Sequence, residues 1–521
     1  MKKRLAPVLV LTLGLALLVS ACGGGKKRTS DMLIWGVGSD PVSLDGALAP
    51  DPDSRRVIAQ VFEGLVTLNP GTTEVVPSLA QTWTPADGGR SWTFHLRSGV
   101  HFQDGTQFDA AAVCFNFERW HGFVGPQRDL STSYYWQRVF GGFVGQPSLY
   151  AGCRAQTRET VVIRLARPSA SFLAALAMPA FSFESPAAIQ RGRAVGTGPF
   201  RVESWNRGDS IVLARNNSYW GAKPILSKIV FRVLADPAAR LAALERGEID
   251  GYDFVDSKDL TRIEGNSDLQ LLDRPAFDLG YLTINSARGP FSDARVRRAV
   301  AYGLDRNALA HSFARGRASV ADEFVPPELF GYAPDVVRYP FDPAKAKALL
   351  RASGLSLPVP LELWYPTGVS RPYLPDPQRA ARIFSRSLER SGFRVTLRYA
   401  PWDGGYLTSV DQGRAGDINL VGWTGDYGDP DNFLGVFFGH PTTQFGFQDR
   451  SLFDLLDRAS SETRRAERAR LYQEANRRIM SLLPGVPLVH SREALALRAN
   501  VQGYISSPVL LESFADVSLA S

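Results

Sequence analysis

The segment 422–433 concentrates side chains that could bind a charged ligand. It reads Gly-Trp-Thr-Gly-Asp-Tyr-Gly-Asp-Pro-Asp-Asn-Phe, so Asp426, Asp429 and Asp431 alternate with glycines and aromatic residues. Three interpretations are open. A calcium loop lacks support, because the glycine and the distal glutamate of an EF-hand are missing. An acidic turn suits the Asp-Pro-Asp-Asn run, and the third interpretation is a carboxylate on an aromatic-lined loop that faces a cation.

Motifs of the common catalytic and metal sites are missing from the sequence. It has no His-Glu-x-x-His, Gly-x-Ser-x-Gly, Cys-x-x-Cys or Gly-Lys-Ser/Thr phosphate loop. The six histidines are well separated, at 95, 101, 121, 311, 440 and 490. Two carboxylates from distant segments could still form a hydrolase site, which keeps a secreted hydrolase as an alternative. We expect no enzyme, no cofactor and no metal site.

The N-terminus has the pattern of an exported lipoprotein. Three basic residues at positions 2–4 precede an apolar run, 6–19, that is too short to span a bilayer. Small residues then lead to Cys22, which looks like the acylated cysteine of a lipobox; an ordinary secretory signal with a chance cysteine is the alternative. We expect residues 1–21 to be removed and 22–32 to form a flexible tether. The protein would then be anchored to the outer face of the cell membrane, on the periplasmic side if the cell has an outer membrane.

Two further cysteines, Cys114 and Cys153, complete the set of three. Export would place them in an oxidising compartment, where a disulfide is allowed. Two buried free thiols are the alternative. The net charge of +7 comes from scattered basic residues, so we expect no nucleic-acid partner.

The elements that position these residues follow from length and periodicity. A chain of 521 residues is too long for one compact core and predicts two or three domains. Alternating apolar residues predict strands at 91–100 and 160–165. Helices are predicted from Pro343, with Asp342 as N-cap and Gly354 beyond the end, at 378–390 and at 461–483. Strands that alternate with helices indicate an α/β protein.

Short motifs along the whole chain resemble the family 5 extracytoplasmic solute-binding proteins of ABC importers. They are Glu63-Gly64-Leu65, Val76-Pro77-Ser78-Leu79-Ala80, Trp92-Thr93-Phe94-His95-Leu96-Arg97, Gly196-Thr197-Gly198-Pro199-Phe200, Arg215-Asn216-Asn217-Ser218-Tyr219-Trp220 and Arg295-Val296-Arg297. Within the family the chain is most similar to the dipeptide-binding proteins, through Gly71-Thr72-Thr73-Glu74-Val75, Arg371-Pro372-Tyr373 and the loop 423–433.

The resemblance implies a two-lobed, periplasmic-binding-protein-like α/β hinge fold with an additional third domain. Its parts would be a discontinuous lobe I (33–60, 187–285 and 490–521), an additional domain II (61–186) and lobe III (286–489). The segment 121–153 is longer and more aromatic than in the enterobacterial members of the family, which leaves the shape of domain II open. The cysteine pair that those members carry near the C-terminal end is also missing.

The resemblance further implies how a ligand is held. Asp426 would bind the α-ammonium of a short peptide and Arg371 its α-carboxylate. This suits a receptor for many peptides, because the two termini are charges that all free peptides share, and a guanidinium matches a carboxylate with two hydrogen bonds. The other candidate site residues are neighbours of these anchors or aromatic residues that could line side-chain pockets. They are Pro372, Tyr373, Trp402, Trp423, Thr424 and Gly425.

We therefore expect a monomeric lipoprotein that captures short peptides, with dipeptides favoured, and delivers them to the permease subunits of an ABC transporter. The nearer alternative is the same fold with another cargo, such as a longer oligopeptide, nickel, haem, an opine or a sugar. Scattered histidines make nickel unattractive. The more distant alternative is the secreted hydrolase.

Overall fold

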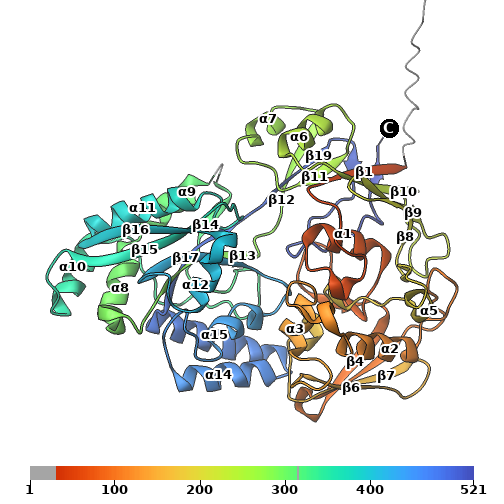
Figure 1. The fold of residues 1–521 in the computed structure, drawn as a ribbon, viewed down its shortest axis with the longest axis horizontal. Coiled ribbons are helices and arrows are strands. Elements are labelled where there is room, and N and C mark those ends of the chain that lie inside the picture. The colour runs from red at the N-terminus through yellow and green to blue at the C-terminus, as the bar shows by residue number, and fades with distance from the viewer. Residues whose placement is uncertain (1–30, 314–315, 521) are drawn as a thin grey trace, which may run out of the picture.

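The computed structural model describes residues 31–313 and 316–520. Cys22, the expected signal segment and most of the expected tether lie outside these residues. None of the helices in the described ranges combines the length and the hydropathy that a membrane span needs. The described chain forms three sheet-based parts, which Figure 1 shows with lobe III on the left, lobe I at the upper right and domain II at the lower right.

Lobe I is built on a seven-stranded mixed sheet with the order β12-β19-β11-β1-β10-β9-β8. Its strands are β1 (Met32–Val37), β8 (Phe200–Asn206), β9 (Ser210–Arg215), β10 (Lys228–Val233), β11 (Gly251–Asp253), β12 (Leu269–Asp273) and β19 (Ala494–Arg498). β1 is parallel to both β10 and β11. The helices of this lobe are α1 (Pro52–Val61), α6 (Pro237–Glu245) and α7 (Leu260–Glu264), and a short pair, β20 (Val501–Gln502) and β21 (Ser518–Leu519), lies near the C-terminus.

Domain II contains a four-stranded antiparallel sheet in the order β4-β5-β7-β6. Its elements are β2 (Val66–Leu68), β3 (Val75–Pro77), β4 (Ala80–Ala86), β5 (Ser91–Leu96), α2 (Ala110–His121), α3 (Tyr134–Phe140), β6 (Tyr150–Ala155), β7 (Thr160–Leu165), α4 (Phe172–Ala175) and α5 (Pro186–Ile189). Cys114 on α2 and Cys153 on β6 are joined by a disulfide. Aromatic rings from α2, α3 and β6 pack together next to it, including Phe117, Trp136 and Tyr150. The long aromatic segment 121–153 is thus part of the core of domain II.

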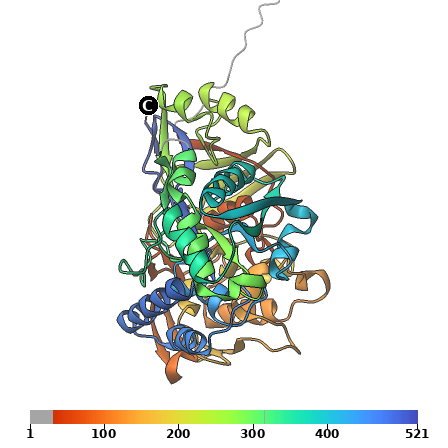
Figure 2. The same cartoon turned by 90° about the vertical axis from the view of Figure 1, so that its left-hand side faces the viewer.

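Lobe III is built on a six-stranded sheet with the order β14-β18-β13-β17-β15-β16. Its strands are β13 (Asp278–Ile284), β14 (Ala318–Val320), β15 (Val359–Thr367), β16 (Phe393–Pro401), β17 (Ile418–Thr424) and β18 (Gly485–Ser491). Its helices are α8 (Ala294–Gly303), α9 (Arg306–Ser312), α10 (Pro343–Ala352), α11 (Pro377–Arg390), α12 (Leu407–Asp411), α13 (Gly435–Phe438), α14 (Arg450–Ser461) and α15 (Arg465–Leu482). Figure 2 views this lobe from the front, with α14 and α15 side by side at its lower end.

The chain passes between the two large sheets twice, at neighbouring places. Residues 274–277 connect β12 to β13, and residues 492–493 connect β18 to β19. The backbone N–H of Arg274 donates to the carbonyl of Glu493 at 2.8 Å, so the two crossings lie side by side. Because β13 already belongs to the sheet of lobe III, the expected lobe I limit at residue 285 falls one strand beyond the change of sheet. Two short adjacent crossings are the usual construction of a hinge between lobes.

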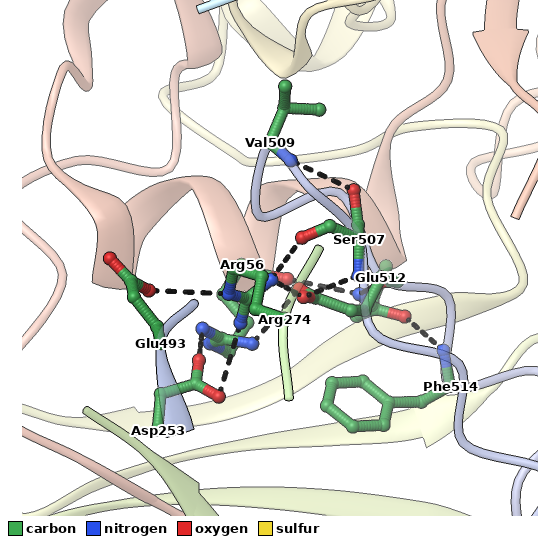
Figure 3. A network of polar contacts seen from close by, with 9 residues as sticks. Arg56, Asp253, Arg274, Glu493, Ser507, Val509, Glu512 and Phe514 are labelled. Atoms are coloured by element: carbon green, nitrogen blue, oxygen red, sulfur yellow. Dashed lines mark hydrogen bonds and ion pairs between the residues drawn. The ribbon is translucent and has the colours of Figure 1, made fainter. Parts of the chain in front are cut away.

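A buried network of charged side chains packs against these crossings (Figure 3). Arg274 lies 3.3 Å from both Asp253 and Glu493, and Arg56 of α1 lies 3.2 Å from Glu512. Arg56 also pairs with Asp253, and Arg274 with Glu512. Burial raises the pKa of Glu493 despite Arg274, whereas Arg274 and Arg56 together outweigh burial and lower the pKa of Glu512. The network therefore sets two guanidinium groups against three carboxylates, next to the two crossings.

Candidate functional site

The acidic loop predicted from the sequence follows β17 and uses two of its three aspartates for structure. Asp429 makes a bidentate pair with Arg468 of α15, at 2.6 and 2.8 Å, and both side chains are buried. Burial, reinforced by the charge of Asp429, raises the pKa of Asp431 to about 6. The Asp431 carboxylate accepts long hydrogen bonds from Ser171 and Tyr472, both at 3.4 Å. Asp426 is thus the aspartate of this loop left to meet a ligand.

Asp426 lines a cavity of about 380 Å³ between domain II and lobe III. Its backbone N–H donates to Asn432 Oδ1 at 2.8 Å, which fixes the loop. Burial raises the pKa of the Asp426 carboxyl, while the charges of Arg55 and Arg138 and hydrogen bonds from Asn432 and Tyr135 oppose this shift. A half-buried carboxylate in a lined cavity is suited to a cationic group.

Domain II contributes side chains to this cavity that the sequence analysis did not assign. Tyr135 and Arg138 both lie on α3 and line the cavity with Asp426. Arg55 lies over the Tyr135 ring, 5.4 Å from its centroid. The unusual length and aromatic content of 121–153 was the available signal, but nothing in the sequence indicated that this segment reaches the acidic loop.

Arg371 lies in a second cavity, of about 690 Å³, between lobes I and III. The backbones of Arg371 and Leu374 exchange two hydrogen bonds, at 3.2 and 2.9 Å, so that Pro372 and Tyr373 form a tight turn. The exposed guanidinium lies over the ring of Trp402, 5.0 Å from its centroid. Pro372 lines the same cavity. The structure therefore brings Arg371, Pro372 and Trp402 together.

Tyr373 points away from this cavity and packs on the sheet of lobe III. Gly280 of β13 and Gly422 of β17 are cross-strand partners, and both make room for Tyr373. A Cβ on Gly422 would lie 2.2 Å from ring atom Cδ2, and a Cβ on Gly280 would lie 2.8 Å from the Tyr373 carbonyl oxygen. The ring is buried, with 5% exposed, so its expected contact with a ligand stays a prediction.

The remaining candidates lie where β17 meets the loop. The Trp423 indole lines the Asp426 cavity and donates to Asn432 Oδ1 at 3.2 Å. Thr424 is exposed and pairs across the sheet with Asp278. Gly425 is packed under Phe277, since a Cβ there would lie 2.2 Å from the Phe277 ring. Phe277 ends the first crossing, so the loop is tied directly to the hinge.

The two proposed anchors occupy different cavities of this structure. Asp426 shares its cavity with Asp431 and Asp457, whereas the cavity of Arg371 is lined by several arginines. Both anchors belong to lobe III, and the contact between Tyr373 and Gly422 connects the segments that carry them. In residues 31–313 and 316–520, no three His, Cys, Asp or Glu side chains gather in a way that could hold a metal ion.

This architecture, two α/β lobes joined by paired crossings with an added domain, is that of a hinged solute-binding protein. The chain belongs to the bacterial extracellular solute-binding proteins of family 5, whose model for the middle region matches residues 74–445. Proteins of this family are the extracytoplasmic binding components of ABC importers and not enzymes.

Relatives with known names share most of the chain. The dipeptide-binding protein of Escherichia coli is 31% identical over 481 residues, covering 88% of this chain and 89% of that protein. Di/tripeptide-binding protein 2 of Pseudomonas aeruginosa is 31% identical, covering 92% and 93%. Heme-binding protein A of Haemophilus influenzae is 28% identical, covering 95% and 93%.

Solved structures agree on the fold. HbpA2 from Haemophilus parasuis superposes with a TM-score of 0.85 at 28% identity, covering 94% of this chain and all (100%) of that one. DppA from Helicobacter pylori, in complex with the peptide STSA, gives 0.73 at 27% identity, covering 94% and 98%. The expected multi-domain α/β fold is thereby confirmed.

Proposed function

We propose that this protein captures short peptides, with dipeptides favoured, by their two charged termini and delivers them to an ABC permease. The observation that carries the proposal is the pairing of two anchors of opposite charge on one lobe. Asp426 and Arg371 are linked through the contact between Tyr373 and Gly422. A free peptide is a zwitterion, so one carboxylate and one guanidinium at a fixed separation match its ends whatever its side chains.

The state of each anchor supports this role. The Arg371 guanidinium is exposed to its cavity and makes no ion pair within 4.0 Å with the described residues. Its position over the Trp402 ring is a cation–π contact, which favours this orientation of the side chain. The walls of the Asp426 cavity include aromatic side chains, two arginines (Arg138 and Arg167) and two further aspartates, and they would shield a bound ammonium from water.

Delivery requires that the bound state differ from the free state. The Arg371 cavity has walls from lobes I and III, and the Asp426 cavity has walls from domain II and lobe III. A ligand held by lobe III would add contacts to the other parts only when the hinge closes. The closed form would be what the permease recognises.

We further propose that the protein works as a monomer attached to the membrane by acylation of Cys22. A cysteine that carries several acyl chains holds firmly, whereas a single chain gives only marginal binding. Cys22→Ala should move the protein from the membrane fraction to the soluble fraction with an unchanged dipeptide affinity. Retention of the variant in membranes after a high-salt wash would contradict the anchor.

Calorimetry with the free, N-acetylated and C-amidated forms of Ala-Phe tests the peptide proposal. The free dipeptide should bind, and each cap should weaken binding by about 10- to 100-fold, because it removes the charge-assisted hydrogen bond to Asp426 or to Arg371. Asp426→Asn and Arg371→Gln should cause similar losses. Two matched controls should bind normally: Asp457→Asn in the Asp426 cavity and Arg382→Gln on the outer surface of lobe III.

Native mass spectrometry of the purified protein completes the test, because it shows what co-purifies. A peptide mass would support the proposal. Haem is the competing cargo to test in a binding titration, since one of the relatives is named a heme-binding protein. Haem binding without dipeptide binding would overturn the proposal while the family assignment stands.

A further inference from the structure

The cavity between lobes I and III has an excess of cationic side chains. Its volume is about 690 Å³, and its walls come from both lobes and from the second crossing. Three carboxylates face it, those of Asp256, Asp376 and Glu493. Six cationic side chains face it as well: Arg240, Lys258, Arg317, Arg371, Arg379 and Arg492.

The carboxylates of this cavity are occupied by other contacts. Asp256 pairs with Lys258 at 3.2 Å. Asp376 is the N-cap of α11 and accepts from the backbone N–H of Arg379 at 2.9 Å. Glu493 belongs to the buried charged network at the crossings and pairs with Arg274 at 3.3 Å (Figure 3). The three carboxylates can offset only three of the six positive charges around the cavity.

Two of the cations share a carboxylate that lies outside the cavity wall. Arg317 and Arg492 both pair with Asp273 at the end of β12, the latter at 3.4 Å. Three arginines remain, Arg240, Arg371 and Arg379. Within the described ranges none of these three makes an ion pair at 4.0 Å or less.

Arg240 is the most informative of the three, because it is buried. Only 7% of it is exposed. Nη1 donates to the carbonyls of Leu234 at 2.5 Å and Ala235 at 3.1 Å, and Nε has no partner among the described residues. A buried guanidinium without an ion pair is unfavourable, and a ligand carboxylate in this cavity would supply the missing negative charge.

One guanidinium is enough for one α-carboxylate, so the cavity has capacity for a second negative group. We infer that this cavity selects peptides whose C-terminal residue is acidic, with Arg240 and Arg379 binding the side-chain carboxylate beside Arg371. In a C-terminal Asp or Glu the second carboxylate is joined to the α-carbon by only one or two methylene groups. It therefore enters the same cavity as the α-carboxylate. The inference rests on the proposed peptide function and adds a side-chain preference to it.

Matched dipeptides test the inference by calorimetry. Ala-Glu should bind about 10- to 100-fold more tightly than Ala-Gln, the range expected for added hydrogen bonds between charged groups. Glu-Ala should show no such gain, because its acidic side chain lies at the other end of the peptide. Raising the salt concentration should reduce the gain of Ala-Glu only in part, because the site is enclosed.

Variants assign the effect to the two arginines. Arg379→Gln and Arg240→Gln should each weaken Ala-Glu much more than Ala-Gln, so that the two affinities converge. Arg379 is exposed, so its variant keeps the test valid if Arg240→Gln does not fold. Arg382→Gln, on the exposed surface of α11 and outside this cavity, is the matched control and should keep the full preference.

The outcomes separate the two proposals. Equal affinities for Ala-Glu and Ala-Gln would overturn the acidic preference and leave the peptide function standing. An equal gain for Glu-Ala and Ala-Glu would also overturn it, because general attraction to a basic protein would explain both. Failure of every dipeptide to bind would overturn both proposals.

Discussion

The ring of Tyr373 lies directly on the backbone of Gly422, with no space for a Cβ between them. Arg371 is two positions before Tyr373, and Asp426 is four positions after Gly422. The contact therefore connects the turn that presents the arginine to the strand that leads into the acidic loop. It links the positions of the two proposed anchors within lobe III.

Gly422→Ala should disturb this separation. The new methyl group would lie 2.2 Å from the ring, so the ring or strand must shift, which costs about 1–3 kcal/mol for an overpacked core. Dipeptide affinity should fall with it. Tyr373→Ala removes the obstacle, so Gly422→Ala should have a much smaller effect in that background. Calorimetry and urea unfolding on the two single variants and the double variant measure the coupling; strictly additive effects would contradict it.

Substitution of Asp429 should affect stability, whereas substitution of Asp426, in the same loop, should affect ligand binding. Asp429 is 2% exposed and neutralises Arg468, which is 5% exposed. Asp429→Asn should therefore lower the free energy of unfolding by about 3–5 kcal/mol, because it leaves a buried guanidinium uncompensated. Asp426→Asn should keep or slightly increase stability at neutral pH, because burial disfavours the charge that the variant removes. Urea unfolding of the two variants decides it, and equal destabilisation would contradict the division of roles.

Much of the local structure could be predicted from the sequence. Asp342 and Pro343 start α10 as expected, and Asp293 caps α8, because capping is decided by neighbouring residues. One helix was expected over residues 461–483. In the structure α14 ends at Ser461, and a second helix, α15, begins at Arg465 and ends at Leu482. The apolar residues on which the helix was predicted, Leu471, Ala475, Ile479 and Leu482, all lie within α15, so they could not fix where the helix begins.

The arrangement of the candidate site could not be predicted in the same way. Tyr373 packs against β13 and β17, and Tyr135 lines the Asp426 cavity from a segment almost 300 positions away. Such contacts depend on tertiary packing and leave no periodic signal in the sequence. The resemblance to the family supplied the candidate anchors, but the contribution of domain II to the cavity needed the structure.

Asp278, the first residue of β13 after the first crossing, should make the free energy of unfolding depend on pH. Burial raises its pKa from 3.8 to about 7, although the backbone N–H of Ser491, at 2.7 Å, and the Ser491 hydroxyl oppose the shift. The folded state therefore binds this proton more tightly than the unfolded state does. Its stabilising effect is complete below about pH 4 and is lost as the pH rises to about 7.

Asp278→Asn keeps the shape of the side chain and removes the titration. The unfolding free energy of the variant minus that of the wild type should increase by about 1.4 kcal/mol per pH unit between pH 4 and 7. Above pH 7 it should be constant. Taking this difference cancels other groups, including His490, whose pKa burial lowers to about 4. Urea unfolding from pH 4 to 8 measures it, and a flat difference would show that Asp278 does not titrate in this range.

Ligand binding should make the protein more compact. The two cavities have walls from different parts of the molecule, so a bound peptide gains contacts when those parts approach. Small-angle X-ray scattering should give a smaller radius of gyration with saturating dipeptide than without it. Asp426→Asn at the same peptide concentration is the control and should stay at the larger value. An unchanged radius in the saturated wild type would indicate a rigid site.

Peptide length should be selected by the fixed separation of Asp426 and Arg371. Each added residue lengthens an extended peptide by about 3.3–3.6 Å, whereas a charge-assisted hydrogen bond forms at about 2.7–2.9 Å. A tripeptide whose ammonium is held by Asp426 would therefore overshoot Arg371, unless it buckles. Loss of that hydrogen bond should weaken Ala-Ala-Ala by about 10- to 100-fold relative to Ala-Ala.

Substitution of Arg371 should change the affinities for the dipeptide and the tripeptide by different amounts. Arg371→Gln should weaken the dipeptide strongly and the tripeptide little, so that the two affinities converge. Arg382→Gln should preserve the difference, because that side chain lies outside the cavity. Calorimetry with Ala-Ala, Ala-Ala-Ala and Ala-Ala-Ala-Ala supplies the measurement. DppA of Helicobacter pylori holds the four-residue peptide STSA, so the family itself does not fix the length. Equal binding of all three peptides would mean that Arg371 does not hold the terminal carboxylate, even if Asp426 holds the ammonium.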